Sequence, residues 1–173
     1  YNRAQLLDET LRSVLAQTYA PREIIVVDDG STDETAALVR GFGAAVRYEY
    51  QPNAGVERAR NRGAALARGD YLYYLDSDDL LKPHAAERLV ALLEAHPEAG
   101  MAYGQAEERD ASGAVTRLFA PPYARPTGVW PGAKELEHLL LASYIPTGAI
   151  LLRHATFAAI GGFRPEFHGM AED

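Results

Sequence analysis

The chain has 173 residues, which is enough for one domain with a substantial core and too few for two comfortable ones. Its formal net charge of -7 argues against nucleic acid as a partner. It has no cysteine, which excludes disulfide frameworks and thiolate metal sites, and no apolar run long enough to span a bilayer. Because the lack of cysteine fits a reducing compartment, we expect a cytoplasmic location. If another segment tethers the domain, this location would be at the inner face of the membrane.

The first hundred residues alternate between helical and strand-like patterns. Apolar residues at helical spacing follow Asn2 and continue to Leu15, and Ser31 with Glu34 predicts a capping box for a helix that ends near Arg40. Further helices are predicted at 56–69 and 83–95, and strands at 23–27, 45–50, 71–75 and 99–104. This alternation predicts an α/β fold made of βαβ units, with a mostly parallel sheet and helices on both faces.

After residue 104 the pattern is less regular. A Pro- and Gly-rich stretch at 121–132 is typical of a loop that covers a site. Helical patterns follow at 134–143 and 154–163, with a short apolar strand between them at 148–152. Both ends of the sequence are abrupt, and we therefore expect further N- and C-terminal parts beyond it.

Two carboxylates, Asp28 and Asp29, come directly after the strand predicted at 23–27. One aspartate at such a position commonly caps the following helix, but Ser31 already offers that cap. A carboxylate at a strand end can accept hydrogen bonds from a ribose hydroxyl or a base N–H. Because ligands of open α/β sheets bind at the carboxyl ends of the strands, we favour a binding role for this pair over a purely structural one.

Three carboxylates, Asp76, Asp78 and Asp79, fall within four positions after the apolar strand predicted at 71–75. These charges repel one another, and no basic residue follows before Lys82. Aspartate oxygens are hard ligands suited to Mg²⁺ or Mn²⁺, and Mg²⁺ is usually held by one or two carboxylates plus substrate phosphates. We therefore favour a metal site over a solvated acidic turn, with Asp79 left open as a cap of the next helix.

A polar cluster follows the strand predicted at 45–50. Asn53 and Gly55 indicate a turn, and Arg60 and Asn61 lie on the helix that follows it. These two helical residues could face a diphosphate or could lie on the solvent side of the helix. The sequence alone leaves both alternatives open.

Together these segments resemble the family 2 glycosyltransferases, which have the GT-A fold. The stretch "EIIVVDDGSTDET" resembles the strand that meets uracil and ribose, "NAGVERARNRG" the segment beside the diphosphate, "DYLYYLDSDDLLKP" the DxD strand, and "GGFRPEFHGMAED" the stretch that ends in an acidic pair. Tyr1 and Asn2 resemble the end of the family's opening strand, so that strand and a downstream acceptor-binding region are expected outside this sequence. The likeness covers nearly the whole chain, with four motifs in the family's order.

The resemblance implies a metal-dependent, inverting transfer of a sugar from a nucleotide sugar, expected to be a UDP-sugar, to a glycan or lipid-linked acceptor. The implied site residues are Tyr1, Asp28, Asp29, Asn53, Arg60 and Asp76 for the nucleotide sugar, Asp78 for Mn²⁺ or Mg²⁺, and Asp173 as general base with Glu172 beside it. Residues 1–103 would form the nucleotide-sugar-binding half of a single GT-A domain, and residues 104–173 the start of its acceptor-side half. A role in cell-surface polysaccharide or glycan synthesis, near a membrane surface, is a further implication.

Three other functions fit parts of the pattern. A phosphoacceptor receiver domain also has an acidic pair after an early strand, but the Thr or Ser and Lys strand ends that it needs are not evident. A haloacid-dehalogenase-type phosphatase needs D-x-D-x-T, whereas Leu80 stands two residues after Asp78. A catalytically inactive module that binds nucleotide sugars fits the same motifs as the transferase.

Overall fold

The computed structural model describes residues 1–20, 23–121, 128–141 and 144–167. The helices of this part are α1 (Ala4–Leu15), α2 (Thr35–Gly41), α3 (Val56–Leu66), α4 (Ala85–Ala95), α5 (Gly132–Leu141) and α6 (His154–Ile160). The strands are β1 (Ile25–Asp29), β2 (Arg47–Gln51), β3 (Tyr71–Tyr73), β4 (Met101–Tyr103), β5 (Ala106–Arg109), β6 (Val115–Phe119) and β7 (Ile150–Arg153). None of the helices in these ranges is long and apolar enough to cross a membrane.

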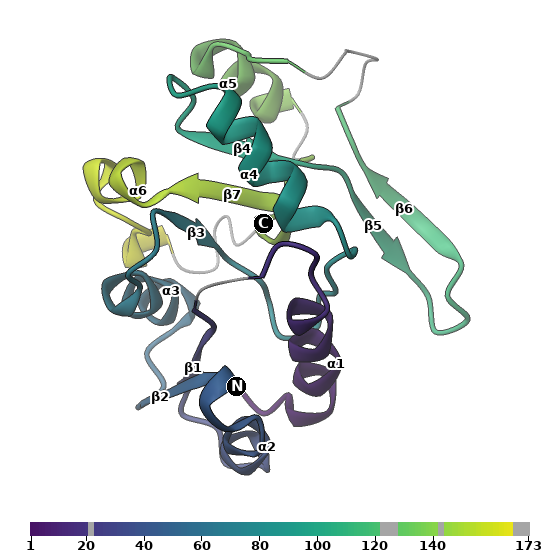
Figure 1. The fold of residues 1–173 in the computed structure, drawn as a ribbon, viewed down its shortest axis with the longest axis vertical. Helices are drawn as coiled ribbons and strands as arrows, with labels where there is room; N and C mark the ends of the chain where they lie inside the picture. Colours follow the sequence, from purple (N-terminus) through teal and green to yellow (C-terminus); the bar gives the residue numbers. More distant parts are fainter. Residues whose placement is uncertain (21–22, 122–127, 142–143, 168–173) are drawn as a thin grey trace.

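The described strands form three sheets (Figure 1). β1 and β2 pair in parallel, from Ile25 opposite Arg47 to Asp29 opposite Gln51. β7 lies between β3 and β4 and is antiparallel to both, and β5 and β6 form an antiparallel hairpin. The α/β class is confirmed, but parallel pairing is confined to β1 and β2 because β7 enters its sheet in the opposite direction.

The helices bury their apolar faces against the sheets in three clusters. α1 and α2 pack against β1 and β2, α3 packs on β1, α4 packs on β4 and β7, and α6 packs on β7. Side chains of α3, β3 and α6 also meet in one cluster. The buried members are Leu7, Leu11, Val39 and Val46 in the first cluster, Leu89, Leu93, Ala102 and Leu151 in the second, and Ala64, Leu72 and Phe157 in the third. The hydrophobic effect on these contacts holds each helix to its strands.

The start of α2 differs from the capping box that the sequence predicts. The N-cap residue is Glu34, whose side chain makes no capping bond, and Oδ1 of Asp33 accepts hydrogen bonds from the backbone N–H and the hydroxyl of Thr35 at 3.1 and 2.5 Å. Ser31 instead accepts a bond from the backbone N–H of Asn2 at 2.9 Å. The prediction of a Ser31–Glu34 box is therefore wrong, because the Ser31 hydroxyl is used to hold the start of the chain.

The β5–β6 hairpin is an element that the sequence did not predict. Its strands are joined by a turn with typical turn residues, Asp110 and Gly113. The Gly113 N–H donates to the carbonyl of Asp110 at 2.9 Å, and Gly113 has a φ of 83°. The hairpin extends to one side of the molecule (Figure 1), and Val115 and Leu118 on it are exposed. The weak alternation of its strands explains why the pattern was missed.

Candidate active site

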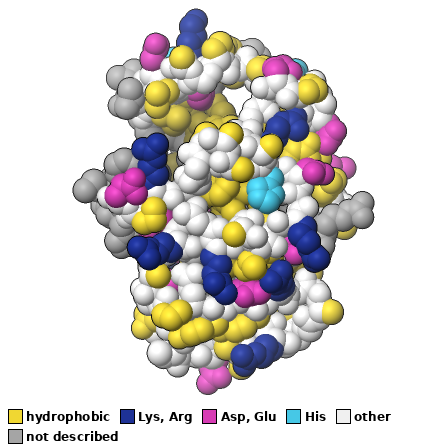
Figure 2. Space-filling view, turned by 90° about the vertical axis from the view of Figure 1, so that its left-hand side faces the viewer, with side chains coloured by type: hydrophobic (Ala, Val, Ile, Leu, Met, Phe, Trp, Pro, Cys, Tyr) yellow, Lys and Arg dark blue, Asp and Glu magenta, His cyan; other side chains and the backbone are white. Residues whose placement is uncertain are grey.

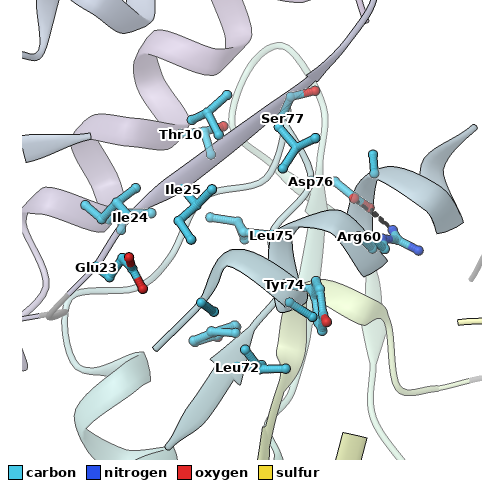
Figure 3. Close-up of a pocket in the computed structure, with 18 of the residues that line it drawn as sticks. Thr10, Glu23, Ile24, Ile25, Arg60, Leu72, Tyr74, Leu75, Asp76 and Ser77 are labelled. Atoms are coloured by element: carbon cyan, nitrogen blue, oxygen red, sulfur yellow. Dashed lines mark hydrogen bonds and ion pairs between the residues drawn. The ribbon is translucent and has the colours of Figure 1, made fainter. Parts of the chain in front are cut away.

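A cavity of about 1510 Å³ lies between β1 and β3, and residues of α1 and α3 line it as well. Its middle is apolar, with Ile25 and Leu75 among the lining side chains, whereas Asp76 and Arg60 lie at one end (Figure 3). That end is where β1 and the extension of β3 reach their carboxyl ends. Ligands of α/β sheets bind at this edge, so the polar end of the cavity is the candidate site.

The structure brings most of the predicted residues to this cavity. The lining residues among them are Tyr1, Asp29, Asn53, Arg60 and Asp76. Asp78 follows Ser77, which lines the cavity, whereas Asp28 is turned away from it. The predicted acidic pair Glu172–Asp173 and most of the predicted covering loop at 121–132 lie outside the described residues.

Asp28 is a buried structural carboxylate, with 3% of its surface exposed. One oxygen accepts the Ser31 N–H at 2.9 Å, and the other accepts the Tyr48 hydroxyl at 2.7 Å. Burial raises the pKa of Asp28, but the hydrogen bonds from Ser31 and Tyr48 outweigh that effect and leave the pKa below its ordinary value. Burial, together with the hydrogen bond to Asp28, raises the pKa of Tyr48 to about 12.

Asp29 shapes the turn that follows β2. Its Oδ1 accepts the backbone N–H of Ala54 at 2.8 Å and its Oδ2 that of Gly55 at 2.9 Å. The Gln51 amide also donates to Oδ1, at 2.7 Å. Asp29 thus ties the end of β1 to the turn that holds Asn53, on the wall of the cavity.

Gly30 permits the close approach of these two segments. It has a φ of 87°, and a Cβ at this position would lie 2.8 Å from the backbone nitrogen of Asn53. A side chain would therefore collide with the turn and would also strain the backbone. The glycine after the acidic pair is required by the geometry of the site.

Arg60 and Asp76 form an ion pair across the mouth of the cavity, drawn as the dashed line in Figure 3. One guanidinium nitrogen lies 2.8 and 3.1 Å from the two carboxylate oxygens of Asp76. The guanidinium also stacks over the ring of Phe163 at 5.3 Å, and the Arg60 side chain is only 11% exposed. The solvent-side alternative for Arg60 is therefore wrong, and its charge is held at the site.

Asn61 has a structural role that differs from the predicted alternatives. Its amide donates to the carbonyl of Phe163 at 2.7 Å, and its Oδ1 accepts the N–H of Phe163 at 2.9 Å. Both polar atoms of the Asn61 side chain are therefore bonded to the backbone of the segment after α6. This pair fixes Phe163 beside Arg60 at the candidate site.

Asp78 and Asp79 lie in the turn beyond β3 and point to different partners. Asp78 accepts a hydrogen bond from Arg3 at 2.7 Å, and both side chains are about half exposed. Asp79 lies against η2 (Thr147–Ala149), where a Cβ on Gly148 would be 2.6 Å from its Oδ2. α4 begins only at Ala85, so Asp79 does not cap it.

The carboxylates at the site could bind a divalent ion only if other groups, such as substrate oxygens, supplied its remaining ligands. No group of three or more His, Cys, Asp or Glu side chains that could hold a metal occurs in the described part of the chain. Asp76 and Asp78 are 40% and 45% exposed, so an ion can reach both. This fits a Mg²⁺ or Mn²⁺ that takes one or two protein carboxylates and completes its shell with substrate oxygens.

Arginine side chains line the cavity although the whole chain is acidic. Arg60 on α3, Arg68 after it and Arg3 before α1 are among the lining residues. Figure 2 shows Lys and Arg side chains in a loose band across one face of the molecule, with acidic side chains among them. Arg3 was missed by the sequence reasoning, because nothing in the local pattern relates it to Asp78, 75 positions away.

Comparison with known proteins gives consistent matches. A sequence profile described as "Glycosyl transferase family 2" matches residues 1–156. A "PGL/p-HBAD biosynthesis glycosyltransferase" of Mycobacterium bovis is 30% identical over 176 residues, which cover 99% of this chain and 63% of that protein. In seven further curated relatives, the chain spans between 14% and 36% of their length.

Solved structures share the fold at lower identity. TarS of S. aureus, residues 1–349, has a TM-score of 0.73 and 21% identity over 98% of this chain and 50% of that one, and TarS has also been solved with UDP. A mannosyltransferase of Pyrobaculum calidifontis, in complex with GDP-Man and Mn²⁺, has a TM-score of 0.65 and 21% identity over 96% of this chain and 46% of that one. Both confirm the expected fold.

Proposed function

This chain belongs to glycosyl transferase family 2, and we propose that it transfers a sugar from a nucleoside diphosphate sugar to an acceptor hydroxyl. The observation that carries the proposal is the meeting of Asp29, Arg60 and Asp76 at one end of the cavity, with Asp78 two residues further along. The nucleotide ligands of the two solved structures support the same class of donor. UDP is the nucleotide to test first, and GDP the second.

The nucleoside end of the donor would be held by the walls of the cavity near β1. Tyr1 is 60% exposed there and offers a ring on which a base can stack. Asn53 offers an amide to the base or ribose, and Asp29 keeps the turn that carries it in place. Asp28 supports this wall from behind through Ser31 and Tyr48.

The diphosphate would lie between Arg60 and the two acidic side chains beyond β3. Asp78 would hold a Mn²⁺ or Mg²⁺, with Asp76 next to it at the ribose or diphosphate. When bound, such an ion neutralises the charge that the leaving nucleoside diphosphate gains. Arg60 keeps a further positive charge at the mouth of the cavity, because its stacking on Phe163 restrains it.

The proton of the acceptor would be removed by Asp173, with Glu172 beside it. Asn61 holds the backbone of Phe163 at the site, and Glu172 and Asp173 follow Phe163 in the same C-terminal stretch of the sequence. A base that acts on the face opposite the leaving group gives inversion at the anomeric carbon. The acceptor would be a glycan or a lipid-linked sugar, in synthesis of a cell-surface polysaccharide.

Calorimetric titration of UDP in the presence of Mn²⁺ tests the assignment of Asp78. We expect Asp78→Ala to weaken binding by at least about tenfold, or roughly 1.4 kcal/mol, because the ion loses its protein ligand. Asp8→Ala is the matched control, since Asp8 also pairs with an exposed arginine but lies on α1 away from the site. Wild-type affinity in the Asp78 variant would place the metal elsewhere.

A further inference from the structure

We propose that Arg3 couples metal binding to nucleotide binding. Arg3 neutralises Asp78 until a divalent ion takes the place of its guanidinium group, and Arg3 then pairs with the diphosphate. This inference rests on the roles that the proposed function gives to Asp78 and the diphosphate. It adds a residue to the site that no motif in the sequence marks. Three observations carry it: the fixed backbone of Arg3, the exposure of its ion pair and the charge of the site.

The backbone of Arg3 is held in place from both sides. Asn2, directly before it, has a φ of 51°, which is uncommon for a residue other than glycine. The Asn2 N–H donates to Ser31 Oγ at 2.9 Å, and its side-chain oxygen accepts the N–H of Thr32 at 2.8 Å. On the other side, the carbonyl of Arg3 accepts the N–H of Leu7 in the first turn of α1. Arg3 is therefore aimed at the turn beyond β3 by several contacts.

The side chain of Arg3 is free to change partner, unlike that of Arg60. It reaches Asp78 at 2.7 Å, but both members of the pair are exposed, at 51% and 45%. An exposed ion pair contributes little free energy, so an incoming ion can replace the guanidinium at small cost. Arg60 is only 11% exposed and is stacked on Phe163, so it stays in place.

The charges of the site match such an exchange. Asp76 and Asp78 are each paired with one guanidinium group, that of Arg60 and that of Arg3. A divalent ion and the two negative charges of a nucleotide sugar's diphosphate would together add no net charge. The ion would then pair with Asp78, and Arg3 would be released to a phosphate oxygen beside the fixed Arg60, since guanidinium groups bind phosphate well in bidentate geometry.

This exchange predicts effects of opposite sign for the two ligands. In Arg3→Ala, Mn²⁺ alone should bind about two- to fivefold more tightly, since it no longer competes with an exposed ion pair. UDP in saturating Mn²⁺ should bind about tenfold more weakly, because a charge-assisted hydrogen bond to the diphosphate is lost. A residue that only supports the structure would weaken both or change neither.

Two titrations of the same set of proteins test the proposal. Free Mn²⁺ is counted by electron paramagnetic resonance as the ion is added alone, and UDP is titrated by calorimetry in saturating Mn²⁺. The set consists of the wild type, Arg3→Ala, Arg3→Lys and the control Arg12→Ala, whose arginine pairs with Asp8 on α1. Arg3→Lys keeps the positive charge without the planar fork, so its Mn²⁺ affinity should stay near the wild type while UDP binding falls.

The outcomes separate this inference from the proposed function. Tighter Mn²⁺ and weaker UDP in Arg3→Ala, with Arg12→Ala unchanged, would support the exchange. A shift of both affinities in one direction, or of neither, would overturn it while leaving the metal site intact. A folded wild type that binds neither Mn²⁺ nor UDP would instead overturn the proposed function.

Discussion

Asp28 and Asp29 are neighbours at the end of β1 with different environments, because successive side chains of a strand point in opposite directions. Asp28 is buried against Tyr48, and Asp29 holds the turn at Asn53. The sequence predicts that both lie at a strand end, and this is confirmed. It could not separate their roles, since the partners that distinguish them come from β2 and the turn after it.

Asp28→Asn tests the structural role of Asp28. The amide keeps the size of the side chain but loses the negative charge. Only one oxygen then remains to accept hydrogen bonds, where the carboxylate accepts the Ser31 N–H with one oxygen and the Tyr48 hydroxyl with the other. We expect the free energy of unfolding to fall by about 1–3 kcal/mol at pH 7, the range for weakening charged hydrogen bonds of a buried group. Urea denaturation followed by circular dichroism measures this, and an unchanged midpoint would show that these bonds add nothing.

The pH dependence of the same pair of proteins gives a second readout. The pKa of Asp28 is lower in the folded than in the unfolded state. Its ionised carboxylate therefore contributes fully to the free energy of unfolding at pH values above the unfolded-state pKa. This contribution is lost as the pH falls from the ordinary value of an aspartate, about 4, through the lowered folded value. The difference between wild type and Asp28→Asn should therefore shrink below about pH 4, and a difference that grew in acid would contradict the lowered pKa.

The helices and strands were predicted best where the signals that start and end them are local. Gly161, with a φ of 83°, ends α6 as the paired glycines predict. The β5–β6 hairpin was missed because its strands lie outside the core and lack strong alternation. The predicted cap of α2 was wrong because Ser31 bonds to Asn2, and no local pattern shows a contact over 29 positions.

The paired glycines after α6 allow a matched test of how the segment near Phe163 is held. Gly161 and Gly162 both have positive φ, so alanine strains the backbone at either position, by about 1 kcal/mol. Only at Gly162 would the new Cβ meet Asn61 Oδ1, at 2.7 Å, and Phe157, at 3.2 Å, whereas Gly161 faces open space. We expect Gly162→Ala to lose at least about 1 kcal/mol more than Gly161→Ala in urea denaturation. Equal losses would mean that the contact is not rigid.

Across the whole molecule, two sheets meet along one cavity and bring residues distant in sequence to one end of it. The α/β class and the strand ends that carry Asp29 and Asp76 follow from patterns of apolar residues, which the sequence displays. The antiparallel place of β7 and the Arg60–Asp76 and Arg3–Asp78 pairs depend on tertiary packing. They could not be predicted from one sequence, because no local signal encodes which strands and side chains meet.

Sugar transfer to an acceptor depends on the whole site. The Asp173→Asn variant distinguishes transfer from binding of the donor. The amide keeps the shape of the side chain but cannot accept the proton of the acceptor hydroxyl. We expect UDP affinity to stay within about twofold of the wild type, while the transfer rate falls by about 10²–10⁴-fold. A full-length protein assayed with acceptor extracts and radiolabelled UDP-sugars provides the rate. Full activity of the variant would mean that another group is the base.

We propose that the polar end of the cavity is a metal-dependent site for a nucleoside diphosphate. Calorimetric titration of the wild-type chain with UDP, with and without Mn²⁺, tests it most directly. We expect saturable one-to-one binding of UDP in Mn²⁺ that weakens at least about tenfold when the ion is removed by chelation. A folded chain that binds UDP equally well without the ion, or does not bind it at all, would contradict the claim.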